Sequence, residues 1–145
     1  MEFLVREAFL EEVFKVHKSI AEFYEEVPMD FYTSRLKDKI YLALVAEKNG
    51  ELLGFKVGYQ SKKPHVLYSW MGGVKPEFRK SGVATALADF QEKWARKIGF
   101  KKVYFKTRNR FPAMINFGLK RGFKIVKVIP KGGVSNYRVL MMKRL

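Results

Sequence analysis

A short basic loop that contains a glycine joins an apolar run to an amphipathic run, and this junction constrains the fold of the chain more than any other feature. The apolar run, residues 66–74, has the length and the composition of a buried strand. Beyond the loop, apolar residues recur at helical spacing, at Val83, Leu87, Phe90, Trp94 and Ile98. The sequence therefore predicts a strand, a turn and a helix that begins within the loop.

The loop has the properties of an anion-binding site. The first N–H groups of a helix lack intrahelical partners, and the helix dipole adds partial positive charge at the same place. Gly82 lets an anion approach the backbone closely, while Arg79 and Lys80 add full positive charges. Ser81 is predicted to cap the helix. Neither the P-loop pattern nor the dinucleotide-binding glycine pattern is present, so a phosphate site of another kind is expected.

The loop also carries a longer pattern. Arg79, Gly82 and Ala84 form the motif Arg-x-x-Gly-x-Ala, and a Val-x-Pro sequence, Val74 to Pro76, begins five residues before the arginine. This pattern resembles the acetyl-CoA signature of the GNAT superfamily of N-acetyltransferases, and the resemblance extends over roughly residues 40–130. It implies that acetyl-CoA is the co-substrate and that its diphosphate binds to the amides of this loop.

The resemblance to the same family continues after the predicted helix. A strand predicted at residues 102–107 is followed by Asn109, and a short helix predicted at residues 114–120 is followed by Gly122-Phe123. The family has an asparagine at the end of its fifth strand and a Gly-Phe pair before the next strand. The resemblance therefore implies that Asn109 and Lys120 belong to the cofactor site.

The implied fold is α+β, with one mostly antiparallel, twisted sheet of six to seven strands and about four helices. In this fold the fourth strand parts from the fifth at a bulge, and its exposed main-chain groups bind the pantetheine arm. The pair Gly72-Gly73 matches that place, although crowding in a twisted sheet also explains two glycines. The implied cofactor-binding residues are Gly72, Gly73, Val74, Arg79, Lys80, Ser81, Gly82, Val83, Ala84, Thr85, Asn109 and Lys120.

The reaction that the resemblance implies is direct transfer of an acetyl group from acetyl-CoA to a primary amine. Two positions depart from the family. Gly118 stands where many members have a tyrosine proposed as general acid, and Tyr68 stands approximately where some have a glutamate base. The catalytic candidates are therefore Tyr68, acting through water, and Glu26, in the region that shapes the acceptor pocket in relatives. The alternatives are a core or pocket-wall role for Tyr68 and a surface role for Glu26.

The first third of the chain is predicted to supply helices. After a strand at residues 3–6, a helix is predicted at residues 9–25, and residues 30–36 form another short turn. His17 flanks the apolar stripe of the helix and is interpreted as a structural or surface histidine. The predicted inward face is Phe9, Val13, Val16, Ile20 and Phe23, and the candidates for lining an acceptor pocket are Phe31, Tyr32 and Tyr24.

Four further strands complete the predicted sheet. Those at residues 40–47 and 52–59 are joined by Asn49-Gly50, a strong hairpin signal because both residues tolerate positive φ. Two closing strands are predicted at residues 123–129 and 137–143.

Composition agrees with a compact enzyme. With 145 residues, 48% of them hydrophobic, the chain is expected to form a single domain over residues 1–145. It contains no cysteine, which excludes disulfides and thiolate metal sites, and no metal is predicted. The start lacks the layout of a signal peptide and no apolar run is long enough to span a bilayer, so a cytoplasmic location without membrane association is expected.

The charge balance leaves a second function open. The chain has 29 Lys and Arg residues against 14 Asp and Glu residues, a net charge of +15 that attracts anions. CoA is one such anion, and Lys120, Arg121 and Lys124 are predicted near it. The alternative is a non-catalytic module that keeps the fold and binds a ligand or nucleic acid, although the basic residues are dispersed. The acceptor amine and a homodimer through the late strands are also left open.

Overall fold

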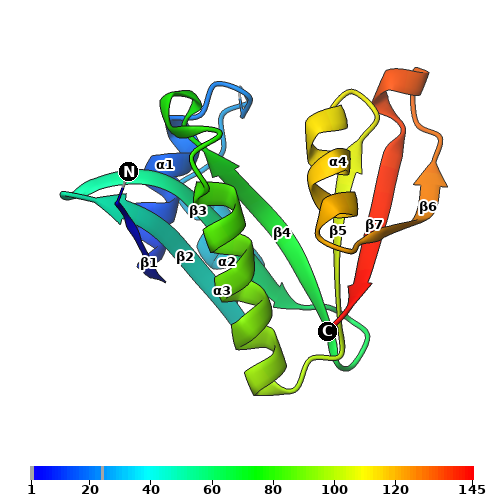
Figure 1. Cartoon of the computed structure of the whole chain (residues 1–145), viewed down its shortest axis with the longest axis horizontal. Coiled ribbons are helices and arrows are strands. Elements are labelled where there is room, and N and C mark those ends of the chain that lie inside the picture. Colours follow the sequence, from blue (N-terminus) through cyan, green and yellow to red (C-terminus); the bar gives the residue numbers. More distant parts are fainter. Residues whose placement is uncertain (1, 24) are drawn as a thin grey trace.

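The computed structural model describes residues 2–23 and 25–145, and it contains one sheet of seven strands in the order β1-β2-β3-β4-β5-β7-β6 (Figure 1). All neighbouring strands are antiparallel except β4 and β5, which are parallel. The mostly antiparallel sheet predicted from the sequence is confirmed. The strands are β1 (Leu4–Glu7), β2 (Tyr41–Lys48), β3 (Glu51–Gln60), β4 (Val66–Val74), β5 (Lys102–Arg108), β6 (Lys124–Ile129) and β7 (Arg138–Arg144).

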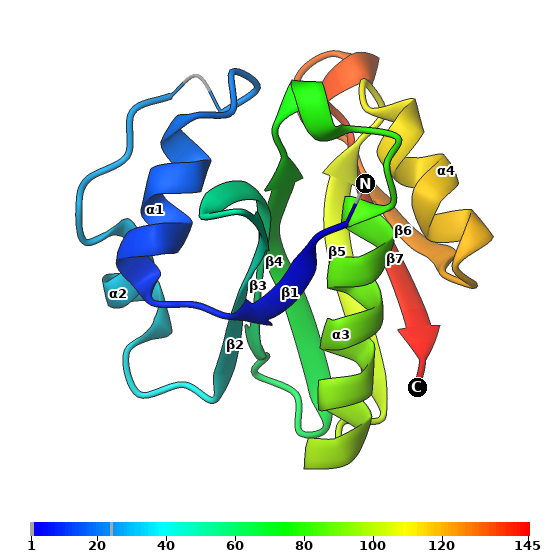
Figure 2. The same ribbon diagram turned by 60° about the vertical axis from the view of Figure 1, so that its left-hand side comes forward.

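Helices cover both faces of the sheet (Figure 2). On one face lie α1 (Leu10–Lys18) and α2 (Phe31–Leu36), and on the other lie α3 (Val83–Ile98) and α4 (Pro112–Lys120). Two 3₁₀ turns, η1 (Pro76–Phe78) and η2 (Val134–Asn136), precede α3 and β7. Across the two described ranges, every helix is too short or too polar to cross a membrane.

The central strands are buried on both faces, which explains their nearly continuous apolar sequences. On β2, Leu42 and Leu44 pack in the cluster that contains the start of α3, whereas Ala43 and Val45 pack in the cluster beneath α1 and α2. The hairpin between β2 and β3 turns at Asn49 and Gly50, whose φ angles are 50° and 83°. The predicted hairpin is therefore confirmed, with left-handed backbone at both positions.

The prediction of one long helix at residues 9–25 is wrong, because α1 ends at Lys18. The hydroxyl of Ser19 donates to the carbonyl of Val16 at 2.6 Å, and the next backbone bonds are of the i to i+3 kind, such as Ile20 to His17. A serine that bonds to the preceding turn competes with continuation of the helix. Ile20 is still buried, but it reaches the core from a turn.

The predicted inward face of this helix is correct only in part. Phe9 is 76% exposed and does not belong to the inward face, because it precedes the first helical turn. Val13 and Val16 are buried as predicted, and Phe23 packs against the same cluster. Tyr24, a candidate for the acceptor pocket, lies outside the described residues.

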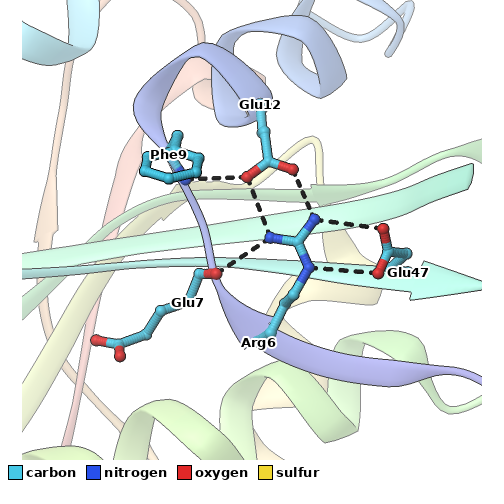
Figure 3. Close-up of polar contacts among 5 residues, drawn as sticks. All are labelled: Arg6, Glu7, Phe9, Glu12 and Glu47. Atoms are coloured by element: carbon cyan, nitrogen blue, oxygen red, sulfur yellow. Dashed lines mark hydrogen bonds and ion pairs between the residues drawn. The ribbon is translucent and has the colours of Figure 1, made fainter. Parts of the chain in front are cut away.

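An ion-pair cluster fastens the first strand to the first helix (Figure 3). Arg6 on β1 donates to Glu12 on α1 at 2.6 Å and to Glu47 on β2 at 3.3 Å. Glu12 also accepts the N–H of Phe9 at 3.0 Å, so its side chain satisfies a free donor at the helix start. The hydrogen bonds from Arg6 lower the pKa of Glu12. These contacts fix the direction in which α1 leaves the sheet.

The sheet splits between β4 and β5 (Figure 1). Three residue pairs join the two strands, from Val66 with Lys102 to Tyr68 with Tyr104. On the other side of β4, Met71 opposes Val57 while Ser69 opposes Gly58, so that among the described pairs Trp70 has no opposite residue. This bulge bends β4 away from β5. The splay predicted between the fourth and fifth strands is confirmed.

Candidate functional site

A groove runs along the loop between β4 and α3 and is closed on its other side by α4. Its volume is about 230 Å³. The loop and the first turn of α3 supply most of its lining, and Phe117 of α4 supplies the opposite wall. The lining residues are Val74, Phe78, Arg79, Lys80, Gly82, Val83, Ala84, Thr85 and Phe117.

The backbone of this loop presents unpaired donors. Lys80 and Gly82 have φ angles of 60° and 87°, a left-handed backbone that turns successive N–H groups toward one side. Within residues 2–23 and 25–145, the N–H groups from Lys80 to Thr85 have no hydrogen-bond partner, and the first bond into α3 is from Ala86 to Gly82. Six donors at the positive end of a 16-residue helix favour an anion.

The predicted helix cap is wrong by one residue. Gly82, not Ser81, is the N-cap of α3, and no side-chain bond from a described residue caps the helix. The Ser81 hydroxyl donates instead to the carbonyl of Phe78. The left-handed conformation at Gly82 turns the chain before the helix begins, which leaves the serine in the preceding turn. The first N–H groups of α3 therefore stay open to the groove.

Arg79 has two partners of its own. Its Nη1 lies 2.6 Å from Glu22, in the segment after α1, and its Nε donates to the carbonyl of Val74 at 3.0 Å. This pair raises the pKa of Arg79 and lowers that of Glu22. Arg79 thus links the loop to the end of β4 and to the α1 side of the sheet, and Glu22 offsets its charge.

The predicted glycine pair follows the bulge on β4 but does not line the groove. A Cβ at Gly73 would stand 2.9 Å from the Ile20 side chain and 3.0 Å from that of Phe23. Packing against the segment after α1 therefore accounts for this glycine. A Cβ at Gly72 would meet neighbours at ordinary distances, the nearest being the Phe55 carbonyl at 3.4 Å. Gly72 is exposed along the part of β4 that has left β5.

Asn109 and Lys120 also lie outside this groove. The Asn109 side chain donates to the carbonyl of Val134 at 3.0 Å, which holds the loop after β5 against η2. Lys120 is exposed at the end of α4. Its neighbour Arg121 is bound to Asp89 at 2.8 Å and to Glu92 at 2.9 Å. The structure thus brings together Val74 and most of the loop residues, but not these two.

The space beside Gly118 is occupied by side chains from β5 and β7. Gly118 lies on the buried side of α4, where a Cβ would stand 2.8 Å from the Phe105 ring and 3.0 Å from the Met141 side chain. A ring from β5 therefore occupies the space beside the helix. A larger side chain at position 118 would have to displace Phe105.

Tyr68 lies on the opposite face of the sheet, at the last residue pair before the splay. Its ring stacks on Tyr104 with 4.6 Å between centroids and meets Tyr59 edge-on at 5.4 Å. Burial, with the neighbouring tyrosines, raises the pKa of Tyr68 to about 12, so its hydroxyl stays protonated at neutral pH. Glu26 is exposed between α1 and α2 and forms no hydrogen bond or ion pair with the described residues.

His17 is structural. Its ring is buried, its Nδ1 lies 2.6 Å from the Tyr32 hydroxyl, and it stacks on Phe23. Burial lowers the pKa of His17 and raises that of Tyr32, so both groups are neutral near pH 7. Phe31 packs on Trp70 with 5.2 Å between centroids, and Tyr32 is buried, so these two acceptor-pocket candidates belong to the core beneath α1 and α2.

A second, water-sized cavity of about 10 Å³ lies between α3, α4 and the sheet. The sequence interpretation missed its polar lining, which includes Lys56, Ser69, Gln91, Glu92 and Arg121. Gln91 is 2% exposed, and among the described residues its Nε2 has no hydrogen-bond partner. One signal was present in the sequence: a lysine between Phe55 and Val57, inside a strand that is apolar on both faces.

Lys56→Met is expected to stabilise the protein at pH 7. Burial and the charge of Arg121, opposed by Glu92, lower the pKa of Lys56 to about 8. In the unfolded chain the lysine pKa has its ordinary value of about 10.4. Between pH 8 and 10 the unfolded state therefore binds more protons than the folded state, and the free energy of unfolding of the wild type rises with pH. Lys56 keeps some solvent contact. We therefore expect the free energy of unfolding to rise by about 2 kcal/mol, which is less than the free energy equivalent to the whole pKa shift.

Urea unfolding at pH 7 and pH 10 measures this gain. It should shrink at the higher pH, where wild-type Lys56 is neutral in the folded protein. Lys62→Met, at an exposed lysine in the loop after β3, is the control and should change stability little at either pH. Equal effects of the two substitutions, or a gain that does not depend on pH, would contradict the burial of charge at Lys56.

Among the residues that the structure describes, no group of three or more acidic, histidine or cysteine side chains comes together. The chemical resources of the site are a row of backbone donors, a gap in the sheet beside β4, and an aromatic surface at Tyr68. This arrangement suits binding of an extended polyanionic ligand whose far end reaches the gap.

Comparisons with known proteins agree with this arrangement. Residues 6–123 match the model of the Acetyltransferase (GNAT) family. An acetyltransferase from Pectobacterium atrosepticum is 35% identical over 92 residues, which are 63% of this chain and 63% of that protein, so less than two thirds of the relative is matched. An N-alpha-acetyltransferase from Sulfurisphaera tokodaii is 29% identical over 119 residues, 72% of this chain and 70% of the relative.

Among solved structures, that of Ard1 from Thermoplasma volcanium is similar over the whole chain. The TM-score is 0.84 and the identity 21%, with 100% of this chain and 99% of the other covered. At this identity the likeness establishes the fold. The family match therefore shows the family, and the structural likeness shows the fold.

Proposed function

The chain belongs to the GNAT family of acetyltransferases, and from that premise we propose that it moves an acetyl group from acetyl-CoA directly to a primary amine. The observation that carries the proposal is the row of N–H groups from Lys80 to Thr85, which have no hydrogen-bond partner among the described residues and belong to the loop that lines the groove. A diphosphate needs such a row of donors and gains from the helix dipole. Lys80, exposed beside it, adds a full charge.

The splay in the sheet supports the second part of the proposal. Beyond Tyr68 the backbone of β4 has no strand beside it on the β5 side within the described register. We assign the binding of the pantetheine arm to residues Gly72 to Val74, where the strand is open and leads to the groove through Val74. Binding along a strand edge uses main-chain donors and acceptors and needs no particular side chain.

The proposed chemistry needs little from reactive side chains. The lone pair of a neutral amine bonds to the thioester carbonyl carbon, the carbon–sulfur bond breaks, CoA leaves as the thiolate, and the amine proton passes to water. Positioning of the two reactants supplies much of the rate in such a transfer. The hydroxyl oxygen of Tyr68 is proposed to accept a hydrogen bond from an N–H of the amine and so to orient it, which leaves the amine lone pair free, and Glu26 remains a candidate base.

The name of one relative supports an amine acceptor. The Sulfurisphaera tokodaii protein is named an N-alpha-acetyltransferase, which acts on an α-amine by its name. We propose that the acceptor of this chain is also the α-amine of a peptide or of an amino acid.

A steady-state assay of CoA release, with acetyl-CoA and a panel of amines, tests the proposal. We expect saturation with acetyl-CoA and release that depends on the amine. The net charge of +15 favours one rival, a module that binds nucleic acid without turnover. Titration with a short RNA at several salt concentrations distinguishes it, because phosphate contacts weaken steeply with salt. Salt-dependent RNA binding without acetyl-CoA binding would reject the acetyltransferase.

A further inference from the structure

A patch of aromatic rings lies on the α2 side of the sheet where β4 and β5 part. We call Tyr59, Tyr68, Trp70 and Tyr104 the aromatic patch. The Tyr59 ring stands edge-on to Tyr68 at 5.4 Å and to Trp70 at 5.7 Å, and Tyr68 stacks on Tyr104 at 4.6 Å. Tyr68, Trp70 and Tyr104 each keep part of their surface exposed. The patch therefore offers a half-open aromatic surface at the mouth of the splay.

Three cations surround the aromatic patch. The Arg35 guanidinium of α2 lies 4.6 Å from the centre of the Trp70 ring and donates to the Tyr59 hydroxyl at 3.1 Å. The Lys106 ammonium of β5 lies 5.5 Å from the centre of the Tyr68 ring, and that of Lys39 lies 5.1 Å from the centre of the Tyr59 ring. None of the three pairs with a carboxylate in the described part of the chain. Their charge is thus uncompensated.

These cations have donors to spare. Arg35 uses one of its five N–H groups on Tyr59, and within the described ranges Lys106 has no hydrogen-bond partner. Lys39 is held by the carbonyl of Arg35, at the end of α2. Burial raises the pKa of Tyr68 and of Tyr104, which keeps both hydroxyls available as donors. A surface of donors and cations with no nearby acceptor charge favours an anion.

We infer that Arg35, which contacts Trp70 and Tyr59, and Lys106, which lies over Tyr68, bind a carboxylate of the acceptor. The acceptor is then a primary amine with a carboxylate a few bonds away. This inference rests on the proposed function. Tyr68 and Tyr104 form the last residue pair before the gap, so a molecule held by its carboxylate here has its other end at the opening beside β4. An Arg fork suits a planar carboxylate, while a second cation nearby repels amines that carry further positive charge.

The carboxylate could belong to a side chain of a peptide or to a free amino acid, and two pairs of acceptor molecules distinguish these sources. The first pair is a C-terminally amidated peptide with Glu at its second position and the same peptide with Gln there. The second pair is a free amino acid and its amide. The two members of each pair are similar in size and differ by one negative charge. We expect the KM of the carboxylate member to be at least about tenfold lower in one of the two pairs, and that pair identifies the source.

Arg35→Gln and Lys106→Gln, singly and together, test the residues. The ratio of kcat/KM within the responsive pair should fall toward one in the double variant, chiefly through KM. Lys62→Gln, at an exposed lysine away from the patch, is the control and should keep the wild-type ratio. A wild-type enzyme that does not discriminate within either pair, or a double variant that keeps the discrimination, would overturn the inference.

Binding without turnover keeps this test separate from the proposed function. Titration of the protein alone with each acceptor, followed by intrinsic fluorescence in a Trp94→Phe background so that Trp70 is the reporter, should saturate for the carboxylate member and not for its amide. The double variant should lose the response. Identical responses to both members overturn the carboxylate site whether or not CoA is released. Absence of CoA release with every amine, together with selective binding of the carboxylate, would reject the transfer reaction and keep the site.

Discussion

Replacing Gly82 with valine is expected to weaken acetyl-CoA binding about a hundredfold. Gly82 has a φ of 87° and begins α3 beside the groove, where its conformation directs the unpaired N–H groups. A β-branched residue is strongly disfavoured in that conformation, so the loop must rearrange. The loss of one or two charge-assisted hydrogen bonds, at ~1.5–3 kcal/mol each, corresponds to a change of this size.

Gly99→Val is the matched control for this prediction. Gly99 has a φ of 109° at the opposite end of the same helix, and apart from adjoining residues no described heavy atom lies within 4 Å of the Cβ position at either glycine. Both substitutions therefore strain the backbone without a steric clash. Isothermal titration with acetyl-CoA should show the large loss for Gly82→Val and near wild-type affinity for Gly99→Val. Equal losses would mean that helix stability, not the loop, controls binding.

Glu92→Gln is expected to destabilise the protein by about 4 kcal/mol, because removal of one partner of a buried ion pair leaves the other charge uncompensated. Glu92 is 5% exposed on α3. It binds Arg121 at 2.9 Å and Lys143 at 2.6 Å, which connects α3 to the end of α4 and to β7. Without its charge, Arg121, Lys143 and the nearby Lys56 would share one partly buried region.

Asp89→Asn supplies the control, since Asp89 pairs with the same Arg121 at 2.8 Å from a side chain that is 66% exposed. An exposed pair contributes less than about 1 kcal/mol. Urea unfolding at pH 7 should separate the two variants by about 3 kcal/mol. Similar losses for both would contradict the assignment of Glu92 as the buried counterion that connects α3 to α4 and β7.

Local patterns in the sequence predicted most of the fold. The apolar run at residues 66–74 coincides with β4, and Asn49-Gly50 turns the hairpin, because each depends on nearby residues alone. The helix over residues 9–25 was too long, since its apolar spacing continues through Ile20 and Phe23 although Ser19 has already ended the helix. Periodicity reports which residues are buried, and a turn can bury them as well as a helix.

The part of the site that depends on local conformation was predictable from the sequence. The loop from Arg79 to Thr85 forms the groove because its conformation is set locally by Gly82 and the start of α3. The partner of Arg79 is Glu22, 57 residues away, and the opposite wall of the groove is Phe117 on α4. Such contacts arise from the packing of distant segments, and no local pattern encodes them. Whether Tyr68 and Glu26 act in catalysis stays a prediction.

The packing around Gly118 limits how this protein can be altered. Phe105 and residue 118 share one volume beside α4, and a ring can enter it from the strand or from the helix, but not from both. Introducing a phenol on the helix would need a small residue at position 105 at the same time, a paired exchange rather than a single substitution. A variant with a tyrosine at position 118 therefore requires that β5 and α4 be redesigned together.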